Sequence, residues 1–555
     1  MIDRQRRTLL AGAAALTALP GLVGCERAAA PIAGGWFGAD AERGHALRDG
    51  RWTRPTSSPV LADAGPTRRC AVAIVGGGIA GLAAAHALRR AGVDDLRLFE
   101  LEDACGGNAR GHQMGGMRCP LGAHYLPLPG PEARELAEWL HEIGVARSEL
   151  GRTVFDERHL CHAPQERVFV SAAQAGAPAA GRWHEGLLPL ADASADTLAQ
   201  LRRFAAEVKA LQSELSFAVP TLRSRWSAGL AALDAQSFAV WLGARGYTDT
   251  TLHAYLDYCC RDDYGAGPGL VSAWAGVHYF ASRHGFHAPG DEAPGEARDA
   301  VLTWPEGNAF LAERLAGGLG ERALPARVAT RISPSRHEVA LEIWNARAAQ
   351  PERWVAQHVI VCVPLFIAAR LIDAPPAALA DLAPRLAYAP WLVSNLLLRE
   401  PLLDRPGPAP AWDNVISGSP ALGYVDAMHQ GLRPVAGSTV LTHYWALGGQ
   451  TLAELRAQRA RLLNAPWSAW RDAVLVDLAR AHPDLPGKVE RVDATRYGHA
   501  MLLPTPCLRG DPALAALATP QGRLHFAHAD LSAHSVFEEA FTRGVLAGQA
   551  VALAL

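Results

Sequence analysis

Residues 72–107 read VAIVGGGIAGLAAAHALRRAGVDDLRLFELEDACGG and decide the fold. An apolar run, Val72–Val75, leads into the glycine motif Gly76-x-Gly78-x-x-Gly81, and an alanine-rich stretch typical of a helix follows. A second apolar run, Leu96–Phe99, ends in Glu100, which lies 19 residues after the last glycine of the motif. This order of strand, glycine turn, helix, strand and acidic residue predicts a dinucleotide-binding unit.

Each part of this unit has a physical role beside a dinucleotide. The first glycine permits the tight turn, the second lets the backbone approach the pyrophosphate, and the third lets the helix pack close to the strand. The helix N-terminus faces the phosphate charge, and the acidic residue accepts hydrogen bonds from the ribose hydroxyls. A glycine turn in an ordinary α/β domain does not explain that acidic residue. The predicted contacts are Gly76, Gly78, Ile79, Ala80, Gly81 and Glu100.

The residues that follow make the chain resemble the flavin amine oxidases and their desaturase relatives. Glu100 is followed by Gly106-Gly107 and then by Arg110. In that family the glycine pair lets the chain pass over the FAD diphosphate, and a nearby arginine neutralises it. The resemblance therefore implies FAD as the cofactor, bound without a covalent link, and a Rossmann-type α/β fold.

Other segments extend the same resemblance. Residues 523–530, RLHFAHAD, and 537–544, FEEAFTRG, resemble the family's closing segment, in which a strand, an acidic ribityl contact and a helix aimed at the isoalloxazine follow one another. The resemblance implies that Asp530 contacts the ribityl chain and that Val328 lies on the adenine-contacting strand. It also places Gly122 and Ala123 in the segment that passes beside the flavin.

Composition and length favour a globular protein of two domains. The chain has 555 residues, 49% of them hydrophobic and 19% charged, and its net charge of −2 favours neither nucleic acid nor an anionic membrane surface. We expect an α/β protein with a discontinuous FAD-binding domain, residues 68–150, 300–370 and 495–555. A mixed α+β substrate domain is expected from the inserted residues 151–299 and 371–494.

The N-terminus resembles an export signal. Arg6-Arg7 precedes a moderately apolar stretch, as in twin-arginine signals, and residues 22–25, LVGC, resemble a lipobox that would acylate Cys25. The protein is therefore expected in the periplasm, attached to the membrane by a lipid anchor only. A plain cleaved signal is the alternative. Residues 26–67 lack periodicity and are expected to form a tether.

Three residues are candidates for catalysis. The resemblance places His124 beside the flavin and His499 on its other side, where either could position the substrate or take the amine proton. Many amine oxidases hold a lysine near flavin N5, on the strand that matches Leu392–Leu398, but here Asn395 is the nearest polar residue. Asp262-Asp263 could attract a cationic amine, although adjacent carboxylates more often cap a helix or pair with arginine. Neither histidines nor cysteines have metal-ligand spacing, so no metal is expected.

The resulting prediction is an amine oxidase-like enzyme that oxidises a C–H bond next to an amine by hydride transfer to FAD. The substrate would be a small amine or polyamine, and the electron acceptor oxygen or a quinone. Because the lysine is missing, a desaturase or dehydrogenase of an apolar substrate is the alternative among enzymes. A non-catalytic FAD-bound assembly protein is the alternative outside them.

Overall fold

The computed structural model describes residues 31–52, 65–171, 181–188, 190, 193–283, 285–288, 300–431 and 437–555. The chain divides into two units, residues 1–33 and residues 34–555, and the two large sheets belong to the second. The twin arginines and Cys25 of the expected signal lie outside the described residues. Mixed sheets and helices confirm the α/β class.

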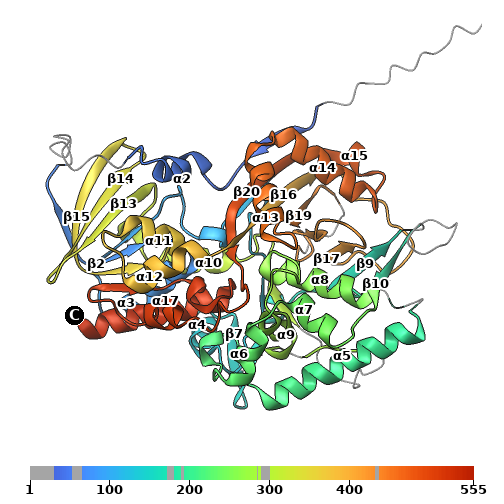
Figure 1. Ribbon diagram of the computed structural model, residues 1–555. Helices are drawn as coiled ribbons and strands as arrows, with labels where there is room; N and C mark the ends of the chain where they lie inside the picture. The colour runs from blue at the N-terminus through green and yellow to red at the C-terminus, as the bar shows by residue number, and fades with distance from the viewer. Residues whose placement is uncertain are drawn as a thin grey trace, which may run out of the picture. The chain divides into compact units, whose positions relative to one another are not determined.

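A seven-stranded sheet contains the predicted dinucleotide-binding unit (Figure 1). Its strand β2 pairs in parallel with β3 and β15, and its last four residues are buried, as expected for a strand covered on both faces. The second half of β15 also pairs in parallel with β21, and its first half pairs antiparallel with β14. The strands are β2 (Arg68–Val75), β3 (Leu96–Phe99), β12 (Ala323–Leu324), β13 (Arg327–Pro334), β14 (Val339–Asn345), β15 (Gln350–Val361) and β21 (Leu524–Phe526).

Helices cover both faces of this sheet. Val72 and Ile74 face a core shared with α3, α4, α10 and α17, whereas Ala73 and Val75 face one shared with α11, α12 and α16. Helices α3 and α17 lie side by side. They can pack this closely because Gly544 has no side chain: a Cβ there would lie 2.2 Å from the Ala80 carbonyl oxygen. These helices are α3 (Ile79–Arg90), α4 (Arg134–Glu142), α10 (Ala309–Gly317), α11 (Leu365–Leu371), α12 (Ala377–Leu382), α16 (Pro512–Leu517) and α17 (Phe537–Ala554).

The two inserts build one eight-stranded sheet, in the order β1-β20-β16-β19-β18-β17-β9-β10. At its centre β16 pairs antiparallel with both β19 and β20, and β17 pairs in parallel with β9, which comes from the first insert. The strands are β1 (Ala33–Trp36), β9 (Glu166–Val170), β10 (Arg182–Glu185), β16 (Tyr388–Leu398), β17 (Asp413–Ile416), β18 (Tyr424–Asp426), β19 (Thr439–Ala446) and β20 (Val489–Leu502).

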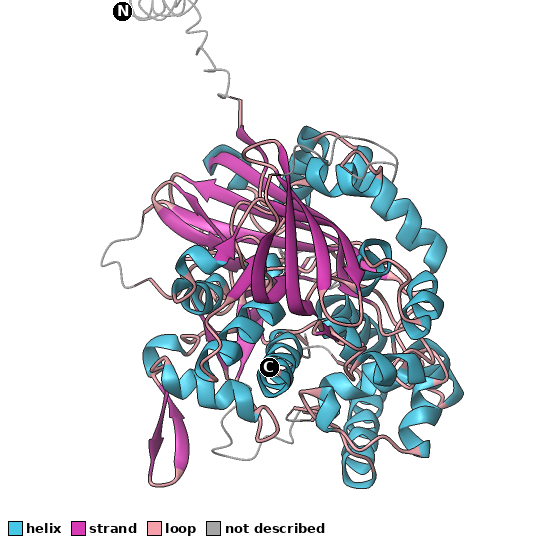
Figure 2. Ribbon diagram, turned by 90° about the vertical axis from the view of Figure 1, so that its left-hand side faces the viewer, coloured by secondary structure: helices cyan, strands magenta, loops and turns pink. Residues whose placement is uncertain are grey.

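Two groups of helices accompany this sheet, and Figure 2 shows helices on both sides of the strands. Helices α13 and α14 pack on β20, and five further helices share a core of their own that contains Trp241 and Trp274. The members are α13 (Leu452–Asn464), α14 (Trp467–Ala479) and α15 (Leu485–Lys488), then α5 (Ala195–Glu214), α6 (Ala228–Asp234), α7 (Phe238–Ala244), α8 (Thr250–Tyr264) and α9 (Ala273–Ala281). Short strand pairs complete the fold: β4 (Gly111–Met114) with β5 (Met117–Pro120), β6 (Tyr125–Pro127) with β11 (Val301–Thr303), and β7 (Ala146–Glu149) with β8 (Arg152–Phe155).

Three of the predicted boundaries are wrong. Within the expected tether of residues 26–67, residues 33–48 contain β1 and helix α2 (Ala41–Arg48), and β1 pairs with β20. Strand β20 runs across the predicted border at residue 495 because it pairs along its length, from Val489 to Leu502, with β16 of the substrate sheet. Residues 371–382, assigned to the substrate domain, pack instead against the seven-stranded sheet through Leu379 and Leu382.

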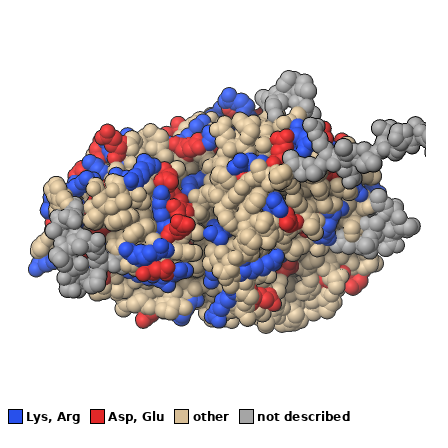
Figure 3. All heavy atoms as spheres, turned by 90° about the horizontal axis from the view of Figure 1, so that it is seen from above, with Lys and Arg blue, Asp and Glu red and all other residues tan. Residues whose placement is uncertain are grey.

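Basic and acidic side chains are interspersed on the face seen in Figure 3 rather than separated by sign. Among the described residues, no helix has the length and apolar character needed to cross a membrane.

Candidate functional site

The glycine motif forms a cradle at the N-terminus of α3. Gly76 has a φ of +105°, and a Cβ there would lie 2.7 Å from the Cys362 carbonyl oxygen. Gly78 and Gly107 approach each other so closely that a Cβ on Gly107 would lie 3.1 Å from the Gly78 Cα. No side chain caps α3, which leaves its first backbone N–H groups, at Ile79 and Ala80, and its positive dipole end to an anion. A diphosphate fits this cradle.

Glu100 is held next to the cradle. Its carboxylate accepts hydrogen bonds from the backbone N–H of Gly77 at 2.7 Å and of Glu102 at 2.8 Å. Burial raises the pKa of Glu100, and these two bonds oppose that rise. Val328 is buried on β13, directly after Arg327, whose N–H donates to the Glu100 carbonyl. The acidic residue and the strand predicted to lie near adenine are therefore adjacent.

Asp530 lies in the 3-10 turn η7 (Ala529–Ser532), at the end of the same sheet. Its Oδ2 accepts hydrogen bonds from the Leu365 N–H at 2.9 Å and from the Tyr388 hydroxyl at 2.5 Å. Its buried Oδ1 lies 3.0 Å from His528 Nδ1, but it forms no hydrogen bond while that nitrogen accepts one from the Asp530 N–H. This orphaned acceptor suits a hydroxyl group such as those of a ribityl chain.

Arg110 is bound by protein groups rather than left free for a phosphate. Its Nε donates to the Gly107 carbonyl at 3.1 Å, its Nη1 donates to the Gly38 carbonyl at 3.2 Å, and it pairs with Glu102 at 3.5 Å. It thus fixes the second glycine loop of the cradle. Its expected contact with the diphosphate remains a prediction.

A cavity of about 170 Å³ is lined by residues of β16, β19, β20, α8, α17 and the segment around Gly122. The Gly122–Tyr125 segment forms one wall, and a Cβ on Gly122 would lie 2.3 Å from the Asn108 carbonyl oxygen. Trp391 and Val393 of β16 form another wall, with Tyr444 of β19. Other lining residues are Asn108, Pro127, Asp262, Asp263, Arg283, Asn308, Tyr497, Ala500, Met501, Ser535, Val536, Phe537 and Glu538.

The two adjacent aspartates of α8 have different environments. Successive helical residues point about 100° apart. Asp263 binds His534 at 3.0 Å and Arg283 at 3.2 Å. Burial alone would raise the pKa of Asp263, but Arg283 and His534 hold it well below its usual value.

Asp262 faces the cavity and forms neither a hydrogen bond nor an ion pair within the described residues. Burial and then the charge of Asp263 raise the pKa of the Asp262 carboxyl to about 7. Glu538 also lines the cavity, and burial raises the pKa of its carboxyl. A cavity with carboxyl groups in this state attracts a cation, and a cation there would restore the charged form of Asp262.

His124 lies in the cavity wall, and its side chain packs against aromatic rings. Its ring stacks on Tyr444 with centroids 4.2 Å apart, and Trp412 lies 5.5 Å away. The Tyr444 hydroxyl donates to the Gly122 carbonyl at 2.9 Å, which fixes the stacked pair. Burial lowers the pKa of His124 to about 3, so its imidazole is neutral at physiological pH.

The expectation that His499 lies across the same cavity is wrong. His499 is exposed, and the centroid of its ring lies 4.8 Å from that of Phe366 and 6.1 Å from that of Tyr388. The cavity is lined instead by its neighbours on β20, Ala500 and Met501. The segment approaches the cavity as the resemblance implied, but the strand turns the imidazole away.

Asn395 is also misplaced as a catalytic candidate. Its amide is buried, with Nδ2 donating to the Pro120 carbonyl at 2.9 Å and Oδ1 accepting from the Thr442 hydroxyl at 2.7 Å. These bonds tie β16 to β19 and to the segment that leads into Gly122. The residues of β16 that line the cavity are Trp391 and Val393, and neither side chain has an amino group like that of lysine.

Sequence reasoning underestimated the acidic pair, for which helix capping or pairing with arginine was the favoured interpretation. Asp263 takes both Arg283 and His534 as partners, which leaves Asp262 without a partner among the described residues. Neither partner could be identified from spacing, because they lie 20 and 271 residues from Asp263 in the chain.

Comparisons agree with this architecture. The family model described as flavin containing amine oxidoreductase matches residues 79–552. Putrescine oxidase with bound putrescine has a similar structure, with a TM-score of 0.65 and 17% identity, covering 88% of this chain and 100% of that one. Cyclohexylamine oxidase from Brevibacterium oxydans IH-35A gives 0.63 and 17%, over 87% and 99%. At such identity the likeness shows the fold alone.

A curated relative has a shorter match. Coproporphyrinogen III oxidase of Mycobacterium tuberculosis (strain ATCC 25618 / H37Rv) is 35% identical over 113 residues, which are 19% of this chain and 24% of the relative. The match therefore spans about a quarter of that relative's length.

Proposed function

Since the chain belongs to the flavin-containing amine oxidoreductase family, we propose that it oxidises the C–H bond next to the nitrogen of a small cationic amine. Its cofactor is FAD, for which the glycine cradle, Glu100 and the orphaned Oδ1 of Asp530 provide fitting contacts. Bound FAD supplies the hydride acceptor for such a reaction. One observation carries the proposal of an amine: the carboxyl of Asp262 faces the cavity without a partner in the part of the chain that the structure describes.

Asp262 first binds the substrate as an ammonium ion. The amine must lose one proton before its C–H bond can be broken, and a carboxyl group with a pKa of about 7 is suited to hold that proton at neutral pH. Asp263 cannot replace it, because Arg283 and His534 occupy its oxygens. We therefore assign proton acceptance to an Asp262 oxygen.

Aromatic rings orient the substrate and exclude water. His124, Tyr444 and Trp391 line the cavity, and aromatic rings attract cations. His124 is a positioning residue in this scheme, because a pKa of about 3 makes it a weak base at neutral pH.

A second carboxyl group favours a diamine or polyamine. Glu538, in the first turn of α17, also lines the cavity, and burial raises the pKa of its carboxyl. A second ammonium group beside it would favour its charged form. The name of the structurally similar putrescine oxidase agrees with a diamine substrate.

The electron acceptor in this proposal is oxygen or a quinone. The β16 positions that line the cavity hold tryptophan and valine, so the lysine common in amine oxidases has no counterpart on this wall. A slow reaction of the reduced flavin with oxygen, relative to a quinone, is therefore expected.

Anaerobic photometry of the yellow protein tests the function. Putrescine and a monoamine such as cyclohexylamine should bleach the flavin, and butane-1,4-diol, which has the same length without charge, should not. Bleaching by an apolar substrate such as a carotene, with none by amines, would establish the desaturase alternative. No bleaching by any substrate would favour an assembly protein.

We further propose that the protein is exported by the twin-arginine pathway and anchored through Cys25. The support is the sequence of residues 1–25 alone. Replacing both Arg6 and Arg7 by lysine should retain the precursor inside the cell. Cys25→Ala should move the exported protein from the membrane to the soluble periplasmic fraction, because the acyl chains supply the anchoring energy. Wild-type protein found only in the cytoplasm would refute both steps.

A further inference from the structure

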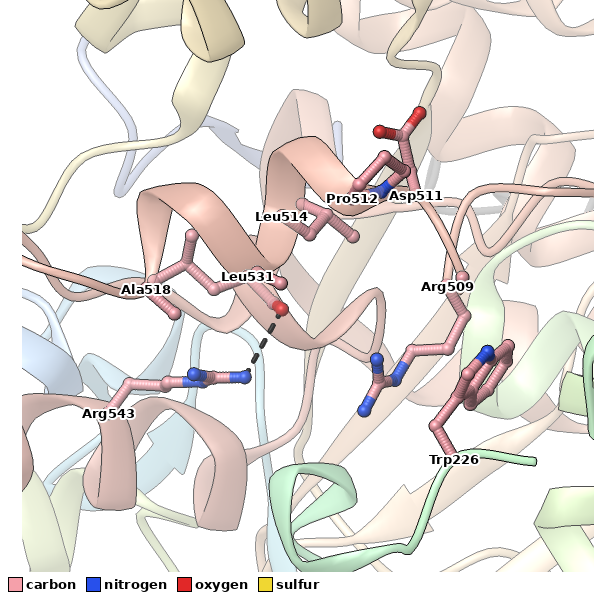
Figure 4. Close-up of a pocket in the computed structure, with 10 residues that line it drawn as sticks. Trp226, Arg509, Asp511, Pro512, Leu514, Ala518, Leu531 and Arg543 are labelled. Carbon is pink, nitrogen blue, oxygen red and sulfur yellow. Dashed lines mark hydrogen bonds between the residues drawn. The ribbon is translucent and has the colours of Figure 1, made fainter.

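A second pocket lies apart from the amine cavity. It has a volume of about 330 Å³ and is bordered by α16, the turn η7, α17 and Trp226 (Figure 4). It shares no lining residue with the cavity that contains Asp262. Nothing in the proposed amine oxidation uses it.

Two arginines extend into this pocket from different elements. Figure 4 shows Arg543, from α17, and Arg509, from the loop before α16, reaching toward each other beneath Leu514 and Leu531. Neither guanidinium forms an ion pair with a described carboxylate. Arg543 donates only to the Ser532 hydroxyl at 3.1 Å and the Leu531 carbonyl at 3.2 Å. Arg509 donates to the Thr221 carbonyl at 3.0 Å, and its buried Nε has no hydrogen-bond partner.

No acidic residue among those described contacts the two guanidinium groups directly. Asp511 lines the pocket, but its carboxylate pairs with Arg385 at 2.7 Å and caps α16 through the Ala513 N–H. Glu539 lies close enough to favour both charges and Asp234 favours that of Arg509, yet neither forms an ion pair with them: Glu539 Oε1 accepts from the Thr221 N–H, and Asp234 Oδ2 accepts from the Gly510 N–H at 3.0 Å. Burial lowers the pKa of Arg543 to about 10 and also lowers that of Arg509. Two arginines are thus held close together in a buried place without a described carboxylate in direct contact.

The remaining walls are apolar. Around the guanidinium groups lie Leu514, Leu531, Ala518 and Pro512. Trp226 closes one side, where the guanidinium carbon of Arg509 lies 5.2 Å from the centroid of the indole ring. Two planar guanidinium groups match the oxygens of a carboxylate, and the walls match a short apolar body. A strongly hydrated phosphate would leave those walls without a partner.

We propose that this pocket is a second binding site, which takes a small organic carboxylate with its oxygens between Arg509 and Arg543 and its apolar part against Leu514 and Leu531. The ligand binds without reaction. The site is independent of the amine chemistry proposed for the cavity.

Calorimetric titration of the FAD-loaded protein with hexanoate tests this site, with acetate and inorganic phosphate as comparisons. Hexanoate should bind, and more tightly than either comparison. Arg543→Gln and Arg509→Gln should each weaken hexanoate about 10- to 100-fold, because each removes a charge-assisted contact. Arg134→Gln, which removes an exposed arginine elsewhere, should have no effect.

A second variant guards against damage to the fold. Ala518→Trp keeps both arginines and fills the pocket from the exposed end of α16, so it should abolish hexanoate binding while amines still bleach the flavin. The proposal is wrong if hexanoate fails to bind the wild type, or binds the three pocket variants as it binds Arg134→Gln. Equal or tighter binding of phosphate or acetate would overturn the assignment to an apolar carboxylate. Competition between hexanoate and putrescine would place hexanoate in the amine cavity and refute the second site.

Discussion

Asp262→Asn removes a cavity carboxyl that forms neither a hydrogen bond nor an ion pair within the described residues. The pKa of Asp262 is raised from 3.8 to about 7, and each pKa unit corresponds to about 1.4 kcal/mol, so ionising this carboxyl in the ligand-free protein costs about 4 kcal/mol. A bound ammonium ion relieves part of that cost. With charge-assisted hydrogen bonds typically contributing about 1.5–3 kcal/mol, the variant should bind amines roughly 10- to 100-fold more weakly.

The pH dependence gives the sharper test of this variant. Alkylammonium groups keep their charge up to about pH 10, so a pH dependence of binding between pH 5.5 and 8.5 comes from the protein, in which the pKa of Asp262 is raised to about 7. Wild-type affinity for putrescine should therefore rise with pH through about 7, and that rise should be absent in Asp262→Asn. The assay is anaerobic titration of the flavin spectrum at each pH. Asp472→Asn, an exposed aspartate of α14, is the matched control.

Protein stability should respond in the opposite sense. A carboxyl whose folded-state pKa is raised favours the folded state at low pH, and that contribution is lost as pH rises from 3.8 through about 7. Without amine, Asp262→Asn should thus match the wild type near pH 4 and exceed its stability above pH 7, by at most about 4 kcal/mol. Thermal unfolding at both pH values measures this. Identical putrescine affinity and identical pH profiles in the two proteins would refute the assignment of Asp262.

Three further predictions follow from the site. Gly78→Val places a branched side chain between the two glycine loops and should give colourless protein. The control Gly487→Ala, whose added Cβ would meet open space, should keep its flavin absorbance. A yellow Gly78→Val protein would contradict the assignment of the cradle to FAD. His124→Ala should slow flavin reduction by about tenfold or more in stopped-flow measurements, while the exposed His499→Ala stays within about twofold; the reverse order would restore His499 to the site. Asn395→Leu leaves the Pro120 carbonyl and the Thr442 hydroxyl without their partner and should lower stability by about 1–3 kcal/mol in thermal unfolding, and an unchanged melting temperature would show that these bonds contribute little.

Local chemistry made the dinucleotide unit predictable. Strand β3 has the predicted bounds, 96–99, because its apolar residues end clearly at Glu100. The glycine motif specifies its own geometry, since a Cβ at Gly81 would lie 1.9 Å from the Gly76 carbonyl oxygen. These features depend on residues close together in the sequence.

The cavity depends on long-range contacts, which is why its residues were harder to identify. The role of Asp262 follows from what Asp263 binds, and His534 joins that group from the opposite end of the chain. The side to which His499 points depends on a register shift between Ala389 and Trp391 in the pairing of β16 with β20. Asn395 was chosen for polarity alone, and only the positions of Pro120 and Thr442 show that its amide is fully used.

The pairing of β1 with β20 has a practical consequence for producing the protein. Residues 34–38 cover the outer edge of β20: the Phe37 N–H donates to the Ala494 carbonyl at 2.8 Å, and the Gly38 carbonyl accepts from Arg110. A shortened protein that started at residue 68 would keep the whole dinucleotide unit yet leave that edge open. An open edge strand pairs readily with other chains, so the shortened form should aggregate during purification. Cleavage before Cys25 leaves this edge covered, which makes residue 25 a safer starting point than residue 68.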